Sequence, residues 1–311
     1  KINFSKKLSL NGFKRQRQTD ASLIRIYFRY ICVQNRSMYT EYQPSHLLVP
    51  YIDSYWEFKG NPDYGMRIHI LPDGCTDFIF TLGEVANAVE EGSLIMQPYR
   101  SYFVGPMTKY SELVTYTESI HMFGVRFLPC GLSCFTNLPL HEFVNSRVST
   151  NEMKAVFDDT FIEKLGEQKH VTDRIRVVEE YLLAYLARHY QPADSHVAMA
   201  VNMINHSKGK RSVRSLMDDV CLCQRHFERK FKHYTGFTPK EYSRIVKFKN
   251  AVELLRTTTS ANLLTTAVDA GYYDLAHFSK EIKSMSGNTP ASFLSLTVPE
   301  ETTLTYIEPQ R

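Results

Sequence analysis

The stretch LLTTAVDAGYYDLAHFSKEIKSMSG (residues 263–287) has the pattern of two short amphipathic helices joined by a tight turn. Gly271 lies between them and can adopt the positive φ that a sharp turn requires. Asp274 is suited to cap the second helix. Spacing at helical intervals predicts an inward face on this second helix, made of Leu275, Phe278 and Ile282. A short helix, a turn and a second, partly basic helix form the plan of a helix-turn-helix unit.

The same plan occurs earlier, in SVRSLMDDVCLCQRHFERKFKHYTG (residues 212–236). Ser212 is a suitable cap for a first helix, and the break falls at Cys221 and Leu222. Phe227 and Phe231 then lie four residues apart, on the expected inward face of a second helix. The two copies also close alike, with TGFTP after the first and SGNTP after the second. The sequence therefore predicts two helix-turn-helix units.

Between the two units, PKEYSRIVKFKNAVELLRTT begins with Pro239 at a first-turn position and predicts a helix of about 18 residues. At roughly 1.5 Å per residue this helix is about 27 Å long. Two helix-turn-helix units that bind one face of DNA contact half-sites about 34 Å apart. The linking helix is therefore of the right order to place two recognition helices in successive major grooves.

Charge is distributed unevenly along the chain, although the net charge is only +4. Residues 1–37 carry nine Lys/Arg and one acidic residue, a net charge of +8. Residues 38–206 carry twelve Lys/Arg and twenty-one acidic residues, a net charge of −9. Residues 207–296 carry fifteen and eight, a net +7, and residues 297–311 a net −2. A basic segment beside an acidic centre is typical of a protein whose one end binds a polyanion. A solvated basic face is the alternative.

Short β-rich runs separated by Gly, Pro and Asp extend from residue 47 to about 130, which indicates an antiparallel barrel or sandwich. Residues 172–190 then show helical spacing with Thr172 as a candidate cap. The apolar stripe of this helix lies outside the two expected cores, so we expect it to pair with a second copy of the chain in a homodimer. Residues 191–195 (QPADS) break the pattern and are the best domain boundary.

Residues 225–255 and 270–293 closely resemble the DNA-binding region of AraC-type transcriptional regulators, and the resemblance covers roughly residues 196–296. It implies seven helices, two helix-turn-helix subdomains and the linking helix, with double-stranded DNA as partner and RNA polymerase as a candidate partner. By position, the first recognition helix offers Arg225, Glu228 and Arg229 to base edges, and Lys232 to phosphate. The second recognition helix offers Leu275, Ala276, His277 and Lys280. Glu228 has an alternative role in an intrahelical pair with Lys232.

This sequence departs from the family pattern at four positions. Cys221 replaces the usual glycine and Cys223 the expected serine cap, while Thr266 and Ile282 replace isoleucine and phenylalanine. The N-terminal segments LLVPYIDSYWEF, LPDGCTDFIF, FVGPMT and GVRFLPCG resemble, more weakly, an uncharacterised domain often found before this module. Related regulators generally use this half, often a cupin-like barrel, to sense a small molecule and to dimerise.

The N-terminal half offers few catalytic or metal-binding groups. His69 stands alone in its segment, so a core or rim histidine is favoured over a metal ligand, and no cofactor or metal is expected. Arg126 alternates with apolar neighbours, which favours an internal salt bridge over an anion site. Trp56 lies among aromatic residues, as core residues do. The six cysteines contain no C-x-x-C pair and are interpreted as reduced thiols of a cytoplasmic protein, with metal binding or oxidant sensing as the alternative.

Taken together, these patterns predict an α+β chain with a mainly antiparallel β barrel or sandwich, cupin-like, followed by an all-α DNA-binding domain. The expected parts are a basic extension (1–37), a sensing and dimerisation domain (38–190), a linker (191–195), the DNA-binding domain (196–296) and a polar tail (297–311). The basic extension is either an arm that binds a polyanion or a segment that precedes the true start of the protein. The expected function is a non-enzymatic, sequence-specific transcription regulator that responds to a small-molecule effector. The alternatives are an enzyme-like β-barrel fused to a DNA-binding module and a sequence-neutral DNA-packing protein. The sequence contains no run of 18 apolar residues, so it predicts no membrane-spanning helix.

Overall fold

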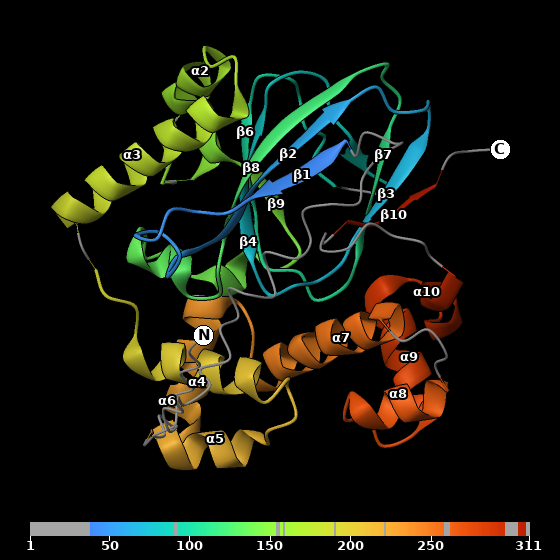
Figure 1. Ribbon diagram of the computed structural model, residues 1–311. Coiled ribbons are helices and arrows are strands. Elements are labelled where there is room, and N and C mark those ends of the chain that lie inside the picture. Colours follow the sequence, from blue (N-terminus) through green and yellow to red (C-terminus); the bar gives the residue numbers. More distant parts are fainter. Residues whose placement is uncertain are drawn as a thin grey trace, which may run out of the picture. The chain divides into compact units, whose positions relative to one another are not determined.

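The structure is a computed structural model that describes residues 38–89, 93–153, 156–157, 159–189, 191–220, 222–257, 262–295 and 304–308. The predicted basic extension (1–37) and Cys221 lie outside these residues. The described chain begins with two β-sheets and continues into helices, as the α+β prediction required (Figure 1).

The two sheets are antiparallel and separate. The six-stranded sheet has the order β1 (Tyr39–Tyr42), β2 (Ile52–Gly60), β8 (Ile120–Phe127), β4 (Thr76–Thr81), β6 (Ser101–Val104), β9 (Arg147–Ser149). The four-stranded sheet has the order β10 (Leu304–Glu308), β3 (Met66–Ile70), β7 (Ser111–Thr115), β5 (Asn87–Ala88). No strand pairing between the two sheets occurs among the described residues, so the sandwich alternative is correct and the closed barrel is not.

Strand β10 differs from the expectation of a polar tail after residue 296. Its backbone pairs antiparallel with β3, Leu304 opposite Ile70 and Glu308 opposite Arg67. The far end of the chain therefore returns to the N-terminal sheets.

The six-stranded sheet is buried on both faces because alternate residues of its strands enter two different cores. One face, with Trp56, Ile79 and Met122, packs against residues of the four-stranded sheet such as Ile68 and Leu113. The opposite face carries six buried aromatic residues: Tyr55, Phe78, Phe80, Phe103, Phe123 and Phe127. This second face packs against the helices that follow the sheets, α2 (Asp159–Gly166) and α3 (Val171–His189).

Helix α3 belongs to this core, which corrects the prediction that its apolar stripe pairs with a second chain. Val178 and Leu182 are 0% exposed and pack against the aromatic face of the sheet. Arg174 adds an ion pair to Glu57 of β2, with 3.0 Å between Nη1 and Oε1. The helix begins at Val171, so Thr172 lies inside its first turn instead of capping it. The stripe therefore gives no support to a dimer.

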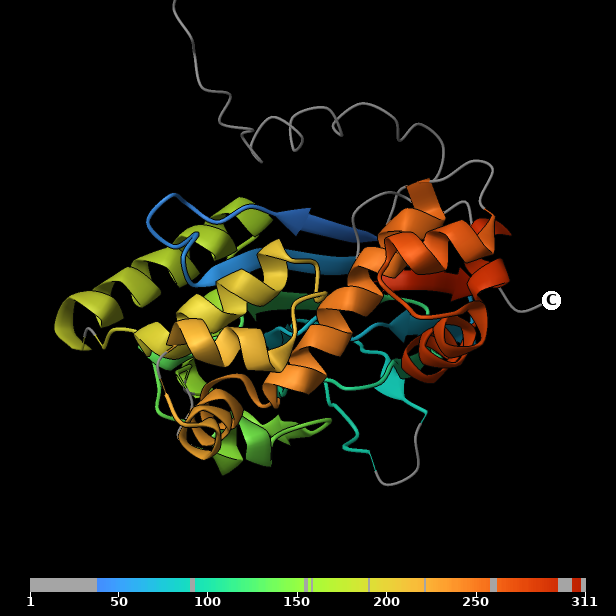
Figure 2. The same cartoon turned by 90° about the horizontal axis from the view of Figure 1, so that it is seen from below.

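Seven helices fill the described residues from Ser195 to Ser295, in agreement with the family resemblance. They are α4 (Ser195–His206), α5 (Val213–Val220), α6 (Gln224–Thr235), α7 (Pro239–Thr257), α8 (Leu263–Asp269), α9 (Leu275–Ser286) and α10 (Pro290–Ser295). Asp194 caps α4 by accepting hydrogen bonds from the backbone of His196 and Val197. Figures 1 and 2 both show α4 to α6 beside one end of α7 and α8 to α10 beside the other. One hydrophobic core joins all of them.

The two helix-turn-helix units repeat each other down to single hydrogen bonds. At the end of α6 the Thr235 hydroxyl donates to the Phe231 carbonyl (2.7 Å) and accepts from the Phe237 amide (3.2 Å). At the end of α9 the Ser286 hydroxyl donates to the Ile282 carbonyl (2.7 Å) and accepts from the Asn288 amide (3.1 Å). The matching TGFTP and SGNTP segments therefore build the same helix ending.

Candidate nucleic-acid interface

The first helix-turn-helix unit consists of α5 and α6, which are separated by three residues in the sequence. Ser212 accepts a hydrogen bond from the backbone of Ser215 (3.2 Å) and so caps α5 as expected. Cys223 stands at the start of α6 without a side-chain capping bond, the position where the family has serine. Phe227 and Phe231 are 0% exposed. They anchor α6 in the core and fix which of its faces points outward.

The outward face of α6 carries the predicted contacts. Arg225, Arg229 and Lys232 are exposed, and Glu228 is half-buried. Glu228 accepts a hydrogen bond from the side chain of Gln224 (2.9 Å), which gives it a different intrahelical partner from the expected Lys232. The Arg225 and Arg229 side chains are four residues apart and share one face of the helix. Whether these side chains contact bases remains a prediction.

The second unit is α8, a tight turn and α9. Gly271 has a φ of 86°, the left-handed conformation predicted for it, and Asp274 caps α9 by accepting from the backbone of His277 (2.7 Å). Phe278 and Ile282 are 0% exposed, although Thr266 and Ile282 depart from the family pattern, so the core of this unit is well packed.

Four predicted contact residues of α9 lie on its outer face. Leu275, Ala276, His277 and Lys280 are all exposed, Leu275 with 37% of its surface. The expectation that Leu275 faces the core is therefore wrong, and its assignment to the outer face of α9 agrees with the geometry. His277 packs edge-to-face on the ring of Tyr272, with ring centres 5.4 Å apart. The second outer face is thus more apolar than the first.

Helix α7 holds the two units apart. It begins at Pro239, as predicted, and runs for 19 residues, about 28 Å at roughly 1.5 Å per residue. It contacts α4 and α6 on one side and α8, α9 and α10 on the other. Arg244 of α7 also forms a two-pronged ion pair with Glu281 of α9, with N–O distances of 2.9 and 3.0 Å. The spacing of α6 and α9 is therefore set by a packed helix.

A small cavity lies between the two sheets. Its volume is about 50 Å³, and its wall is mainly apolar, with Trp56, Ile68 and Met122 among the lining residues. The wall also contains Asp77 and Arg126, which form an ion pair with each other. Trp56 is 6% exposed and donates from Nε1 to Asp77 (2.7 Å), so its predicted core role is confirmed.

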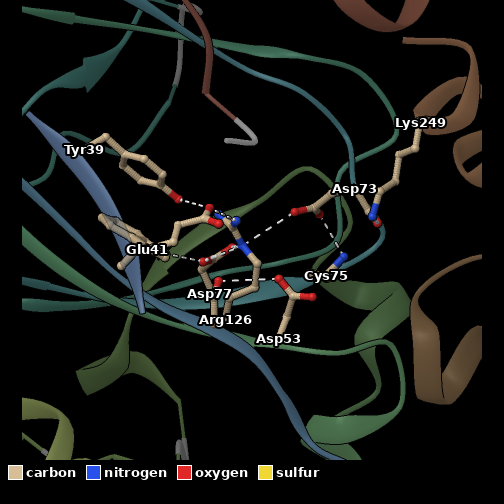
Figure 3. A network of polar contacts seen from close by, with 10 residues as sticks. Tyr39, Glu41, Asp53, Asp73, Cys75, Asp77, Arg126 and Lys249 are labelled. Carbon is tan, nitrogen blue, oxygen red and sulfur yellow. Dashed lines mark hydrogen bonds and ion pairs between the residues drawn. The ribbon is translucent and has the colours of Figure 1, made fainter. Parts of the chain in front are cut away.

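Arg126 lies at the centre of a buried polar network (Figure 3). The salt bridges favoured for it from the sequence are present: its guanidinium reaches Asp77 at 3.2 Å, Glu41 at 3.4 Å and Asp73 at 3.5 Å. Burial raises the pKa of Asp77, and Arg126 opposes that rise. Burial alone would lower the pKa of Arg126, but Asp77, Tyr39 and Asp73 raise it well above its usual value. The guanidinium therefore stays charged.

The same network reaches the helical domain through the turn at residues 73–75. The backbone carbonyl of Asp73 accepts a hydrogen bond from Lys249 of α7 (3.2 Å; Figure 3). Gly74 has a φ of 87°, and a Cβ atom there would lie 2.7 Å from the ring of Tyr242, also on α7. Only a residue without a side chain fits this contact. The sequence favoured an internal salt bridge for Arg126 but did not indicate its partners, because these are far apart in the chain.

The other candidates from the N-terminal half are a histidine and two cysteines. His69 is half-buried and stacks on Tyr110, with ring centres 5.5 Å apart. Cys130 and Cys134 are buried, and burial raises the pKa of both thiols. Among the described residues there is no group of three His, Cys, Asp or Glu side chains placed to hold a metal ion. The same part of the chain contains no helix with the length and apolar character of a membrane span.

Comparisons with known proteins match two parts of the chain. Residues 40–149 match a domain of unknown function (DUF6597), and residues 216–295 match a helix-turn-helix domain. A search of curated proteins found no match.

The chain is also similar to solved structures of low identity. One is ToxT from Vibrio cholerae: 9% identity, 81% of this chain and 98% of that chain covered, TM-score 0.46. A ToxT structure with bound unsaturated fatty acid is 12% identical, with 81% and 99% covered and a TM-score of 0.46. A probable AraC family transcriptional regulator from Rhodopseudomonas palustris is 20% identical, with 32% and 95% covered and a TM-score of 0.30.

Proposed function

We propose that this chain, an AraC-type helix-turn-helix transcription regulator, binds a bipartite DNA site with α6 on one half and α9 on the other. The observation that carries the proposal is the repeated construction of the two units. Each buries apolar residues of its second helix and exposes the opposite face of that helix. A sequence-neutral packing protein does not need two recognition faces of different chemistry, because backbone contacts carry no sequence information.

The two outer faces favour different base pairs. On α6, Arg225 and Arg229 can each bind O6 and N7 of guanine through two hydrogen bonds. On α9, Leu275 and Ala276 are exposed and suit contact with the methyl group of thymine. We therefore expect a guanine-containing half-site for the first unit and a thymine-containing half-site for the second.

The sheet domain acts as the sensor in this proposal. The cavity between the sheets is the candidate effector site, and its 50 Å³ holds only a few water molecules, so a ligand must widen it. Arg126 and Asp77 in its wall connect through Asp73 to Lys249 of α7. Widening the cavity would thus disturb the turn that packs on the helix between the two recognition helices. A sensing role is preferred over an enzymatic one because the charged side chains of Arg126, Asp77 and Asp73 form ion pairs with each other.

The proposal has three further parts. We expect the protein to act in the cytoplasm. Contact with RNA polymerase and assembly into a homodimer stay predictions. Because α3 uses its stripe in the core, a dimer interface must lie elsewhere on the surface.

The test begins with selection of bound sequences from a random pool of duplex DNA, using the full chain. We expect two conserved blocks about one helical turn apart. Inserting about 5 bp between the blocks turns one half-site to the opposite face of DNA, so tight binding should be lost. The same insertion outside the two blocks is the control. Unchanged affinity after the central insertion would show that α7 does not fix the spacing.

A further inference from the structure

A broad groove lies between parts of the two helix-turn-helix units. Its volume is about 560 Å³. Residues from the α4–α5 loop, from α7 and from the second unit line it, among them Lys210, Arg211, Lys240, Lys247, Tyr272 and His277. The groove therefore lies where the parts of the DNA-binding domain meet, and no function is yet assigned to it.

Contacts at the groove tie the α4–α5 loop and α7 to the turn of the second unit. Lys210 of the α4–α5 loop packs beside Gly271, its Cγ 3.0 Å from the position that a Cβ atom would take. Lys247 of α7 donates to the carbonyl of Gly271 (3.2 Å) and lies 5.6 Å from the centre of the Tyr272 ring. Positive charges of the α4–α5 loop and of α7 thus lie beside the turn of the second unit.

The charges of the groove are only partly neutralised. Arg211 is paired with Asp219, and Arg244 with Glu281. Lys210 and Lys240 are exposed, and within the described part of the chain their ammonium groups have no hydrogen-bond or ion-pair partner. Burial lowers the pKa of Lys247, and nearby Lys210 lowers it further against the opposing effect of Glu281. The unpaired positive charge of the groove therefore favours an anionic ligand.

Tyr272, which also lines the groove, carries a buried hydroxyl group. Tyr272 is 6% exposed, and its OH group has no hydrogen-bond partner within the described residues. Buried polar groups normally have one, from protein or from ordered water. Together with the unpaired lysines, this hydroxyl marks the groove as a site for a hydrated polar ligand.

We propose that the groove binds phosphodiester groups of the DNA backbone between the two half-sites, with Lys210 and Lys240 as the contacting cations. The inference rests on the proposed function and adds a third contact region to it. His277 lines the groove and also lies on the recognition face of α9, so the groove opens beside the surface that meets DNA. Such phosphate contacts position a protein on duplex DNA without reading its sequence.

Two lysine substitutions test the proposal. Each phosphate contact contributes about 0.9 to the slope of log K against log salt. Lys210→Ala/Lys240→Ala should therefore reduce the slope by about 1.8 and weaken binding about fivefold per lysine at 0.15 M salt. Selected and scrambled sequences should lose affinity equally. The matched control is Lys164→Ala/Lys169→Ala, which removes two exposed charges near α2 and should leave the slope unchanged.

Modified DNA gives a readout that does not depend on folding of the variant. Neutral methylphosphonates are placed one at a time between the half-sites of the selected sequence and titrated with the unmodified protein. We expect one or two positions to weaken binding, and the same positions to have no further effect in the Lys210→Ala/Lys240→Ala protein. If every central methylphosphonate is tolerated, or if the control variant lowers the slope equally, the groove is not a phosphate site. The two-block selection result would stand in that case, whereas loss of sequence-specific binding altogether would instead reject the proposed function.

Discussion

Replacing Arg126 by methionine should destabilise the sheet domain strongly and in a pH-dependent way. The substitution keeps an unbranched side chain in the site but removes the cation that Asp77, Glu41 and Asp73 share. Three carboxylates then remain close together with little access to water. Removing one partner of a buried ion pair costs about 3–5 kcal/mol. Because these carboxylates retain 9–22% exposure, we expect a loss of about 3 kcal/mol, the lower end of that range.

The sign of the pH effect follows from the same contacts. Without Arg126, the pKa of Asp77 rises further above its unfolded value of about 3.9, since burial already raises it. The folded variant then binds more protons than the unfolded chain between those two pKa values, so its stability falls as pH rises. The penalty of Arg126→Met should therefore be smaller at pH 5 than at pH 8. Adding Asp77→Asn should recover about 0.5–3 kcal/mol, the usual coupling between contacting residues.

The chain contains a single tryptophan, which makes the measurement specific to one domain. Trp56 lies in the sheet domain and donates a hydrogen bond to Asp77. Urea unfolding followed by its fluorescence reports the transition of that domain at each pH. The control is Arg100→Met, because Arg100 is exposed and the change of side chain is the same. A loss below about 1 kcal/mol, or a penalty that grows toward pH 5, would refute the assignment of a buried charge network.

Three other predictions follow from single contacts. Arg229→Ala should cost about 1–3 kcal/mol of binding free energy on the selected site and relax specificity at one base pair, whereas Lys232→Ala should weaken binding to all sequences alike. Titrations on matched and mismatched DNA separate the two outcomes. If Arg229→Ala weakens binding to all sequences equally, Arg229 is a phosphate contact. Burial raises the pKa of Asp194, but hydrogen bonds from Lys230 and the backbone lower it more. Asp194→Asn should thus lower the free energy of unfolding by about 0.5–1 kcal/mol at pH 7. In thermal melts this difference should disappear as the pH falls below about 4. A loss of stability that persists at that pH would instead be due to the capping of α4 by residue 194. Leu182→Asp should cost at least about 3 kcal/mol and reduce soluble yield, and a folded, stable monomer would restore the idea that α3 is a dimer interface.

The helical domain was predictable because its signals are local. Helical spacing, the capping residues Ser212 and Asp274 and the turn residue Gly271 all act within a few positions, and the structure has each of them in its expected role. The repeated closing segments added an internal check. The outer faces of α6 and α9 followed from the inward position of Phe227 and Phe278.

The sheet domain was less predictable because its contacts join distant parts of the chain. Strand β10 pairs with β3 across more than half of the sequence, and no local pattern marks that pairing. The stripe on α3 has the same periodicity whether it meets a sheet or a second chain, so only the fold shows that Val178 and Leu182 enter the core. The partners of Arg126 come from residues 41 to 77, which the sequence alone does not bring together.

The contact between Gly74 and Tyr242 limits how far sensor and DNA-binding domains can be exchanged between relatives. The ring of Tyr242 occupies the space that a side chain at position 74 would need. A chimera that joins this helical domain to a foreign sensor therefore has to bring a glycine with positive φ to the same place, or replace the tyrosine by a smaller residue. Modular assembly of new regulators from such parts thus has to match this pair of positions, which can be done by design before any chimera is made.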